Sequence, residues 1–458
     1  MNRLHPDTLG ELAAGVQQPP YDRRALRPGI LHLGPGAFHR AHQAVFTEDT
    51  LGVAGGDWGI IGVSLRSPTV ADQLTPQDGL YSVLSEDDSE QELRVVGVIQ
   101  RVLVAPREPE AVVAAIADPA IRIITLTITE KGYSLAPDGV SLNRDDAAIQ
   151  SDLANPEQPA SAVGMLALGM RERLAAGGAP LTLLSCDNLC NNSMLLRAVL
   201  LDYLQTTFTQ VLPWLEDHTA FPCSMVDRIV PAMTPERRKK QCNALGLVDE
   251  GAVSTEPYSQ WVIEDLFAAG RPQWERVGVQ LVQDIAPFED IKLRLLNASH
   301  SSIAYCGLLA GKKTVDQVMA DPDLRSFVET LMAKDLMPAL DAPAEFDLGA
   351  YRDQLLARFS NPTLRHRCAQ IAMDGSEKIS QRWLPTLQRR KAPLLCKALA
   401  AWVHFVLDTD FDLDDPRSDR LLVLRASTAA REQRVADTLA CARITPQTVD
   451  NYDALRAE

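Results

Sequence analysis

The sequence predicts an α/β protein with two domains, an amino-terminal one built on a mostly parallel sheet and a mainly α-helical carboxy-terminal one. The 458 residues exceed what one ordinary hydrophobic core accommodates. Up to about residue 285, apolar strand-like runs alternate with helical segments, whereas after about residue 290 long stretches with helical spacing follow one another. We therefore expect a first domain over residues 1–286 and a second over residues 287–458.

Six runs in the first domain are rich in Val, Ile, Leu and Thr, and several end at turn residues, as strands do. They are residues 30–33, 58–65, 93–104, 121–129, 180–187 and 223–230. Between them, residues 159–178 are rich in Ala, Leu, Met and Arg, which favours a helix. Near-continuous apolar strands covered by helices are typical of a parallel sheet. In the second domain, helical spacing is found in residues 321–340, 391–408 and 425–444.

The charge of the chain argues against some classes of partner. The formal net charge is -15 and the pI is near 5.1, so the long-range field repels nucleic acid and anionic membranes. An anionic substrate then needs a local cationic pocket. The amino terminus lacks the apolar core of a signal peptide, and no run of 18 apolar residues occurs. We therefore expect a cytoplasmic protein with no nucleic-acid or membrane partner.

Eight cysteines are scattered through apolar segments without the paired spacing of a structural zinc site. They are Cys186, Cys190, Cys223, Cys242, Cys306, Cys368, Cys396 and Cys441. Because a free cysteine behaves as a small hydrophobic side chain, we expect buried thiols.

A glycine turn follows the first predicted strand. Gly34 can supply the tight turn and Gly36 a close approach of the backbone to a ligand. The helix expected from Ala37 and Phe38 onward presents its N–H groups and positive dipole end to a pyrophosphate. His39 stands where the usual fingerprint has its third glycine. Two interpretations remain at this point: a dinucleotide site with a variant fingerprint, or an ordinary glycine turn.

The next predicted strand ends at Arg66 and Ser67, where an NAD site usually has an acidic residue for the ribose 2′-hydroxyl. An arginine there can accept a 2′-phosphate, so the sequence leaves NADP open beside NAD. The alternative is a solvated arginine that stacks on the adenine.

The segment 287–307 carries four polar groups on one helical face. At about 100° per residue, with Lys292 at zero, Glu289 lies near 60°, His300 near 80° and Asn297 near 140°. Oxidation of a secondary alcohol needs a base, donors for the developing oxyanion and a hydride acceptor. Lys292 is the candidate base if burial lowers its pKa toward neutrality. Asn297 is a candidate oxyanion donor, His300 a candidate for substrate orientation and Glu289 for proton transfer to water. The alternative is a solvated helix face, and the scheme requires no metal.

A second polar cluster, SCDNLCNNS, follows the fifth predicted strand. Asn188 can donate to the same oxyanion as Asn297. The alternative is an Asx turn or a helix cap formed by Asp187 and Asn188. Cys186 and Cys190 have no histidine close in sequence, which argues against metal binding.

Eight motifs stand in order along the chain, from about residue 30 to residue 390. They are GPGAFHRAHQ, GDWGIIGVSLRS, TITEKGY, SCDNLCNN, MVDRIVP, EPYSQWVIED, KLRLLNASHS and NPTLRHRCAQIAMDGSEK. This ordered set resembles the mannitol dehydrogenase family, the polyol-specific long-chain dehydrogenases. The resemblance implies a Rossmann-like amino-terminal domain with a nicotinamide site, in which FHRAHQ is the family's own variant of the fingerprint.

The resemblance also implies metal-independent hydride transfer and roles for individual residues. It implies that Lys292 is the general base, that Asn297 and Asn188 bind the oxyanion, that His300 orients the substrate and that Glu289 gates proton exchange. It implies substrate binding by Asp227 and Lys378. The implied cofactor-binding residues are Gly34, Gly36, Ala37, Phe38, Arg66, Glu130, Lys131 and Asn188.

Two positions depart from the family pattern. Ser193 replaces the usual glycine after SCDNxxxN, and Gln370 stands where mannitol-oxidising members tend to carry arginine. The phrase HRxxQIAMDGSxK is similar to the fructuronate reductase (mannonate oxidoreductase) branch. Arg365, Arg367 and Lys378 stand where a substrate carboxylate can be met, in keeping with a uronate; the alternative is that they are solvated helix-surface charges.

The leading expectation is an enzyme that interconverts fructuronate and mannonate with NAD(H). A mannitol or arabitol dehydrogenase is the alternative within the same class. A non-catalytic nicotinamide-nucleotide-binding protein is the alternative of another class, but it needs neither a base nor an oxyanion site. We expect a monomer or weak oligomer whose partner is a small sugar acid or polyol.

Overall fold

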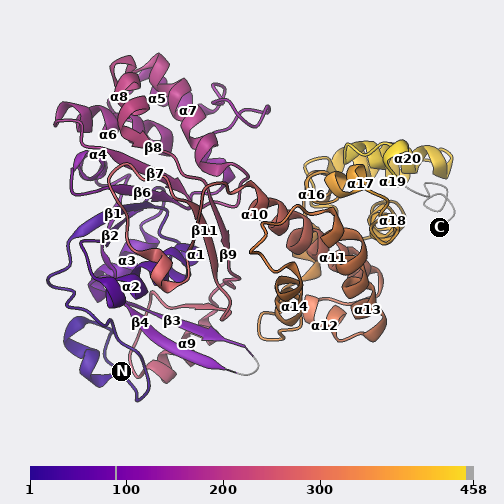
Figure 1. Cartoon of the computed structure of the whole chain (residues 1–458), viewed down its shortest axis with the longest axis horizontal. Helices are drawn as coiled ribbons and strands as arrows, with labels where there is room; N and C mark the ends of the chain where they lie inside the picture. Colours follow the sequence, from indigo (N-terminus) through magenta and orange to yellow (C-terminus); the bar gives the residue numbers. More distant parts are fainter. Residues whose placement is uncertain (88–89, 450–458) are drawn as a thin grey trace. The chain divides into compact units, whose positions relative to one another are not determined.

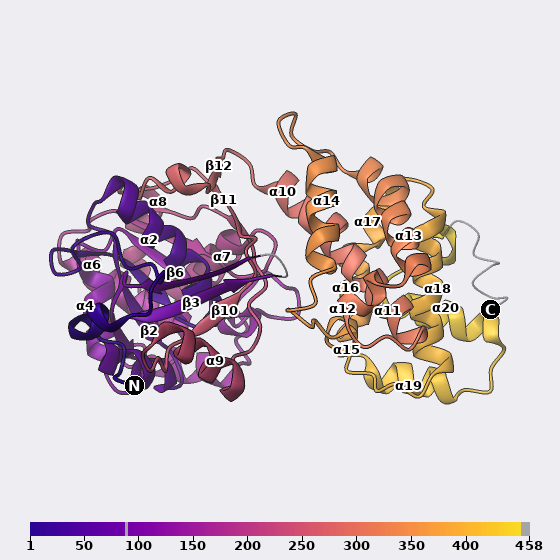
Figure 2. The same cartoon turned by 90° about the horizontal axis from the view of Figure 1, so that it is seen from below.

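The computed structural model describes residues 1–87 and 90–449. The chain divides into two compact units, Met1–Ile285 and Ala286–Glu458. All strand labels in Figures 1 and 2 fall on the first unit, drawn from indigo to rose, and the second unit carries helix labels alone.

A six-stranded sheet forms the centre of the first unit, with the strand order β5-β2-β1-β6-β7-β8. All neighbouring strands in it pair in parallel. The strands are β1 (Pro28–Leu33), β2 (Gly59–Ser64), β5 (Ile99–Val104), β6 (Ile123–Leu126), β7 (Leu181–Ser185) and β8 (Thr219–Ala220). The predicted parallel sheet is therefore confirmed.

Helices cover both faces of this sheet (Figure 1), because successive side chains of a strand point to opposite sides. Leu31 and Leu33 of β1 pack in a core cluster with five helices, whereas Ile30 packs in another cluster with α2. The helices of the first cluster are α4 (Pro109–Ala117), α5 (Ala147–Ala154), α6 (Ala162–Ala175), α7 (Asn192–Thr206) and α8 (Leu212–His218), and α2 spans Gln43–Ala54. The other α-helices described in the unit are α1 (Ala37–Ala41), α3 (Thr69–Leu74) and α9 (Pro235–Leu245). The helix predicted over 159–178 is α6.

One of the predicted strands is divided into two strands in the structure. Residues 93–104 break at Gly97, between β4 (Gln91–Val96) and β5. β4 pairs antiparallel with β3 (Tyr81–Glu86), which the sequence analysis missed. Together with β10 (Val253–Thr255), these two strands form a separate sheet in the order β10-β3-β4.

Another predicted strand lies outside the parallel sheet. Residues 223–230 contain β9 (Ser224–Asp227), which pairs antiparallel with β11 (Gln260–Glu264) in a sheet of order β12-β11-β9. The third strand of that sheet, β12, spans Gln280–Val282. An apolar run predicts a buried strand but does not identify the sheet that the strand joins.

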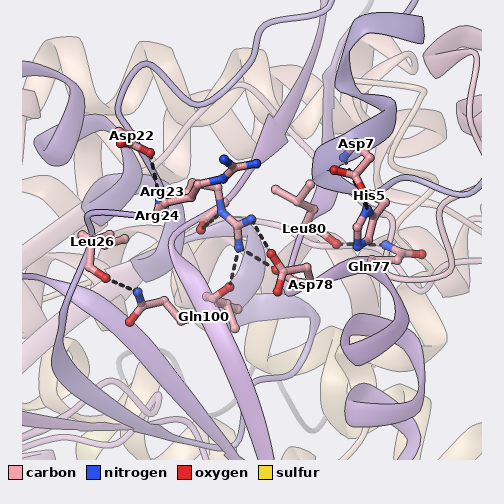
Figure 3. Close-up of polar contacts among 12 residues, drawn as sticks. His5, Asp7, Asp22, Arg23, Arg24, Leu26, Gln77, Asp78, Leu80 and Gln100 are labelled. Carbon is pink, nitrogen blue, oxygen red and sulfur yellow. Dashed lines mark hydrogen bonds and ion pairs between the residues drawn. The ribbon is translucent and has the colours of Figure 1, made fainter.

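The segment before β1 is tied to the sheet edge by side chains (Figure 3). Arg23 donates to the carboxylate of Asp78 at 3.1 Å. It also donates to the carbonyl oxygen of Gly97 at 2.7 Å. The side-chain amide of Gln100 donates to the carbonyl of Leu26. A Cβ at Gly97 would lie 2.6 Å from the Arg23 side chain, so a glycine there allows the arginine to cross the β4–β5 break.

The described residues of the second unit form helices and no strand longer than one bridge, Thr314 to Arg367. The α-helices are α10 (Ala286–Ile291), α11 (Ala298–Leu309), α12 (Val315–Met319), α13 (Pro322–Leu331), α14 (Leu348–Phe359), α15 (Cys368–Ala372), α16 (Gly375–Arg382), α17 (Leu384–Arg389), α18 (Pro393–Asp408), α19 (Ser418–Ala426) and α20 (Arg431–Cys441). The prediction of a mainly helical second part is confirmed, and residues 391–408 correspond to α18.

Two of the predicted helices are interrupted. In 321–340, α13 passes into the π-helix η7 (Met332–Leu336) and then a 3-10 turn at Met337–Ala339, where Pro338 cannot donate a helical hydrogen bond. Residues 425–444 are divided between α19 and α20, because the hydroxyl of Ser427 accepts the N–H of Ala429 in a local turn.

Three broader expectations can be compared with the described part of the chain. No helix in it is both long enough and apolar enough to cross a membrane. No three His, Cys, Asp or Glu side chains in it are grouped so that they could hold a metal ion. Six of the eight cysteines are buried, but Cys306 is only partly buried and Cys190 is exposed, so the expectation of buried thiols is wrong for Cys190, which lies in the loop after β7.

Candidate functional site

The turn after β1 requires glycine at its first position. Gly34 has a φ of +88°, where a side chain is disfavoured, and a Cβ there would lie 2.2 Å from the carbonyl oxygen of Thr127. The Gly34 N–H donates to the carbonyl of Val63 at 2.9 Å. The turn is thus held between the end of β2 and the residue that follows β6.

Gly36 leaves space on its outer side. The nearest atom to a Cβ at Gly36 would be the Gly34 carbonyl oxygen, 3.9 Å away, and both Gly36 and Ala37 are exposed. α1 begins at Ala37, so the N–H groups of its first turn have no intrahelical acceptor. Phe38 stacks on His42, with 5.0 Å between ring centroids. An exposed glycine before a helix start fits the approach of a pyrophosphate to the backbone.

His39 takes the place of the third glycine and packs flat on the strand. Its ring centroid lies 3.3 Å from that of His32 in β1, with 14° between the ring planes. His32 is held by the hydroxyls of Thr125 at 2.7 Å and Thr127 at 2.9 Å. A third glycine normally permits close packing of helix on strand. Here two stacked imidazoles fill the layer between them.

Both stacked histidines are uncharged at neutral pH. Burial lowers the pKa of His32 to about 3. Burial, reinforced by the neighbouring His32 and Arg40, lowers the pKa of His39 well below its usual range. The stack therefore brings no positive charge to the glycine turn.

We expect His39→Phe to make the first unit less sensitive to acid. Below about pH 6.5 the unfolded chain protonates this histidine but the folded chain does not, so its contribution to stability is complete above that pH and is lost as the pH falls toward the folded pKa. The free energy of unfolding of the parent falls by about 1.4 kcal/mol per pH unit through this histidine, which is about 2 kcal/mol at pH 5. Urea unfolding of parent and variant near pH 7.5 and near pH 5 measures the difference. Equal losses in the two proteins would contradict the buried neutral ring.

The loops after four adjacent strands meet at one edge of the parallel sheet. β2, β1, β6 and β7 are neighbours in that order, and the carboxyl ends of parallel strands share an edge. Arg66 follows β2, the glycine turn follows β1, Glu130 and Lys131 follow β6, and Asn188 follows β7. These four side chains are exposed, and Arg66 forms no hydrogen bond or ion pair with a residue of the described ranges. The residues predicted to bind a dinucleotide thus lie at the edge of the sheet where the strand order reverses, between β1 and β6.

Asp187 joins two of these loops. Its carboxylate accepts the N–H groups of Ile128 at 3.0 Å and Thr129 at 2.8 Å, and the hydroxyl of Tyr133 at 2.7 Å. Thr129 has a φ of +63°, a conformation that needs such support. The N-cap of α7 is Asn191, which makes no side-chain cap bond. The interpretation of Asp187 as a cap of its own helix is therefore wrong.

Two further polar residues hold this cluster together; Asn192 was not singled out from the sequence, and Ser193 was noted only as a departure from the family pattern. Asn192 is buried and donates to the carbonyls of Asp187 at 3.0 Å and Ser224 at 2.8 Å, which ties the end of β7 to β9. The hydroxyl of Ser193 accepts the N–H of Ser185 at 2.9 Å. The run of asparagines directly after a strand-end aspartate was the available signal.

Asp227 ends β9 and is 7% exposed. The next residue, Arg228, donates to the carbonyl of Ala41 at 2.5 Å and to that of Glu256 at 3.0 Å. These bonds fix the end of β9 against the end of α1, and Asp227 is thus a buried carboxylate at a fixed strand end.

The segment that carries Lys292 is not a continuous α-helix. α10 passes into the π-helix η6 (Lys292–Asn297), which passes into α11. Five residues of α-helix turn about 140° beyond a full turn. In a π-helix residue i+5 bonds to residue i, so residues five apart lie nearly above one another. The assumed α-helical angles are therefore wrong here, and the π register moves Asn297 toward the face of Lys292.

Asn297 and His300 both retain hydrogen-bonding capacity. Neither the amide of Asn297 nor a ring nitrogen of His300 bonds to any residue that the structure describes. The centroid of the His300 ring lies 4.7 Å from that of the Phe359 ring and 5.5 Å from that of the His366 ring. Burial, together with the positive fields of His366, Arg382 and Arg358, lowers the pKa of His300 well below its usual range. The neutral ring can offer a ligand one donor and one acceptor.

Lys292 and Glu289 are half-buried on η6 and α10. α16 packs against η6 and α11, which places the helix of Lys378 beside the helix of Lys292. The Lys378 ammonium lies 3.4 Å from the carboxylate of Asp374. Arg367 is exposed at the start of α15.

Two consecutive residues at the end of α16 contact the junction of η6 and α11, and the sequence analysis missed both. The indole N–H of Trp383 donates to the carbonyl of Ala298 at 3.1 Å. Nη1 of Arg382 donates to the hydroxyl of Ser301 at 2.8 Å and to the carbonyl of Asn297 at 3.4 Å. The spacing of four residues from Lys378 was the signal that could have indicated Arg382.

Comparison with known proteins finds two family models along the chain. One, described as the mannitol dehydrogenase Rossmann domain, matches residues 28–276, and the other, the mannitol dehydrogenase C-terminal domain, matches residues 284–456.

Individual proteins are similar over most of their length. The chain is 42% identical to a D-mannonate oxidoreductase of Escherichia coli (strain K12) over 396 residues, which are 86% of this chain and 80% of the relative. It is 41% identical to a polyol:NADP oxidoreductase of Gluconobacter oxydans (strain 621H) over 388 residues, 84% of this chain and 80% of the relative. A solved structure of Pseudomonas fluorescens mannitol 2-dehydrogenase, in a ternary complex with NAD and D-mannitol, matches with a TM-score of 0.85 and 34% identity, and covers 99% of this chain and 95% of that one.

Proposed function

Since the chain belongs to the mannitol dehydrogenase family, we propose that it is an NAD-dependent oxidoreductase that interconverts D-fructuronate and D-mannonate. The relatives are named as oxidoreductases and dehydrogenases of polyols and of mannonate, which supports the class of secondary-alcohol dehydrogenases. The observation that carries the proposal is in the second unit: a half-buried lysine begins a π-helix that ends at an asparagine with an unbonded amide, and a neutral histidine follows three residues later.

The residues of this element match the needs of hydride transfer at a secondary carbinol. A bound nicotinamide dinucleotide supplies or accepts the hydride. In reduction, Lys292 in its ammonium form gives a proton to the alkoxide; in oxidation, its neutral amine takes the hydroxyl proton. The Asn297 amide donates to the developing oxyanion, and the neutral His300 ring binds a substrate hydroxyl. Glu289, one turn before Lys292, returns the proton to water.

The residues of the first unit fit a dinucleotide. Gly34 fixes the turn, Gly36 leaves its outer side open and Ala37 begins a helix. We expect NAD to be the preferred cofactor. The exposed Arg66 keeps NADP as the second candidate, supported by the similarity to a polyol:NADP oxidoreductase.

A sugar acid is favoured over a neutral polyol because cations gather around His300 in a chain of net charge -15. Lys378 and Arg367 are proposed to bind substrate, as is Asp227. The second candidate is a mannitol or arabitol dehydrogenase, supported by the 34% identity to a mannitol 2-dehydrogenase. The binding protein without turnover is disfavoured because it needs no base.

We expect the purified protein to oxidise D-mannonate at least about tenfold more efficiently than D-mannitol, which is the effect of one charge-assisted hydrogen bond to the carboxylate. Initial rates with NAD and NADP against mannonate, mannitol and arabitol, and with the reduced cofactors against fructuronate, measure this at the absorbance band of the reduced nicotinamide. Equal efficiency with mannonate and mannitol would refute the sugar-acid assignment and leave the polyol alternative.

A further inference from the structure

Arg382 is fixed beside the polar face of the π-helix and α11. Its Nη1 donates to the hydroxyl of Ser301 at 2.8 Å and to the carbonyl of Asn297 at 3.4 Å. His300, next to Ser301, lies within the electrostatic field of this guanidinium. The cation is therefore held at the element that carries the proposed oxyanion donor and the proposed substrate-orienting histidine.

The other edge of this guanidinium consists of Nε and Nη2. Nε and Nη2 of Arg382 form no hydrogen bond within the described ranges, and no carboxylate there forms an ion pair with it. Arg173 in the first unit shows the contrast, since all three of its nitrogens donate to main-chain carbonyls. Nε and Nη2 of Arg382 also keep some exposure to solvent.

A fixed guanidinium with an open Nε–Nη2 edge suits a carboxylate, whose two oxygens accept two parallel N–H bonds. Burial lowers the pKa of Arg382 only to about 10, so the group is charged at neutral pH. Lys378 lies four residues earlier on the same face of α16, but its ammonium is 3.4 Å from the Asp374 carboxylate. Arg365 and Arg367 are exposed, where water screens their charge. Of these four cations, Arg382 is thus the one best placed to attract an anion.

We propose that Arg382 is a specificity-determining residue that binds the carboxylate of the sugar-acid substrate through its Nε–Nη2 edge. The proposal rests on the proposed function, because it assumes a substrate with a carboxylate. It assigns the discrimination between sugar acid and polyol to Arg382, and leaves the charge of Lys378 largely balanced by Asp374.

The test compares three variants with the parent holoenzyme. Arg382→Met removes the charge, and Arg382→Lys keeps the charge but loses the two-pronged geometry. Arg389→Met is the matched control, since Arg389 is exposed on the next helix and pairs with Asp341 at 3.1 Å. For each protein, kcat and KM are measured for mannonate and mannitol, together with NADH affinity by fluorescence titration and the Tm.

Arg382→Met is expected to lower kcat/KM for mannonate by about 100-fold, mainly through KM, with NADH affinity unchanged. Activity on mannitol, where measurable, is expected to change by less than about threefold. Arg382→Lys is expected to lose about tenfold with mannonate, and Arg389→Met to match the parent.

The possible failures differ from one another. A parent enzyme that does not turn over mannonate refutes the proposed function. A parent active on mannonate whose Arg382→Met variant keeps its kcat/KM refutes the assignment of Arg382 alone. Parallel losses on mannonate, on mannitol and in NADH affinity would assign Arg382 a structural role and also overturn the proposal. If the methionine variant does not fold, the lysine variant decides by the same criteria.

Discussion

Lys292→Ala is expected to lower kcat by about 10²- to 10⁴-fold, the range that a positioned general acid or base contributes. The lysine begins the π-helix η6 and is half-buried, and the alanine variant has no group there to exchange a proton with the substrate. NADH affinity is expected to remain at the parent value, because the glycine turn belongs to the first unit. Initial rates and fluorescence titration with NADH measure the two effects.

Lys334→Ala is the control for this change. Lys334 is an exposed lysine in the other π-helix of the second unit, η7, and makes no ion pair with a described residue. Its loss is expected to leave kcat within about twofold of the parent. If Lys292→Ala were equally active, Lys292 would have no part in the mechanism.

Gly34→Ala is expected to destabilise the first unit by about 3 kcal/mol or more and to abolish dinucleotide binding. The alanine would be strained at a φ of +88°, and its Cβ would lie 2.2 Å from a main-chain oxygen that is fixed by the end of β6. Relief requires a shift of the turn, which carries the backbone groups that face the pyrophosphate. Urea unfolding and NADH titration report the two losses.

Substitutions at two other glycines separate the effect of backbone conformation at Gly34 from the effects of the Cβ contact and of the lost ligand contact. Gly139 has a φ of +75° with no atom within 4 Å of a Cβ, so Gly139→Ala measures the conformational cost alone, about 1 kcal/mol. Gly36 has a φ of -69° and an open side, so Gly36→Ala is expected to unfold like the parent and yet bind the dinucleotide more weakly. If Gly34→Ala were as stable as Gly139→Ala, the main chain at Thr127 would move away from the new Cβ at little cost, and the steric part of this prediction would be wrong.

Much of the first unit could be predicted because buried parallel strands leave a strong signal in the sequence. The runs that became β1, β2, β6 and β7 are apolar on both faces, and their order fixes where Arg66, Lys131 and Asn188 emerge. The stack of His39 on His32 could not be predicted, because a fingerprint that lacks its third glycine does not reveal which strand side chain compensates.

The second unit shows a different limit. Five of the six residues of η6, KLRLLN, are Lys, Leu and Arg, which are good helix formers, so composition does not distinguish a π-helix from an α-helix. Lys292, Asn297 and His300 could be chosen by chemistry, but their common face depends on the register. Arg382 was missed because one arginine at the end of a polar helix is ordinary; only its contacts with Ser301 and Asn297 set it apart.

The π-helix η6 makes this part of the chain unusually sensitive to insertions and deletions. Removal of one residue between Lys292 and Asn297, such as Leu295, would place these two side chains four positions apart, the spacing that shares a face in an ordinary α-helix. A homologue that lacks one residue here would keep the two side chains on one face of an ordinary α-helix. If the full-length segment were an α-helix, the Asn297 amide would point away from Lys292. The number of residues between Lys292 and Asn297 and the type of helix are therefore coupled. A homologous segment can be compared with this one only if its length and its helix type both place the two side chains on one face.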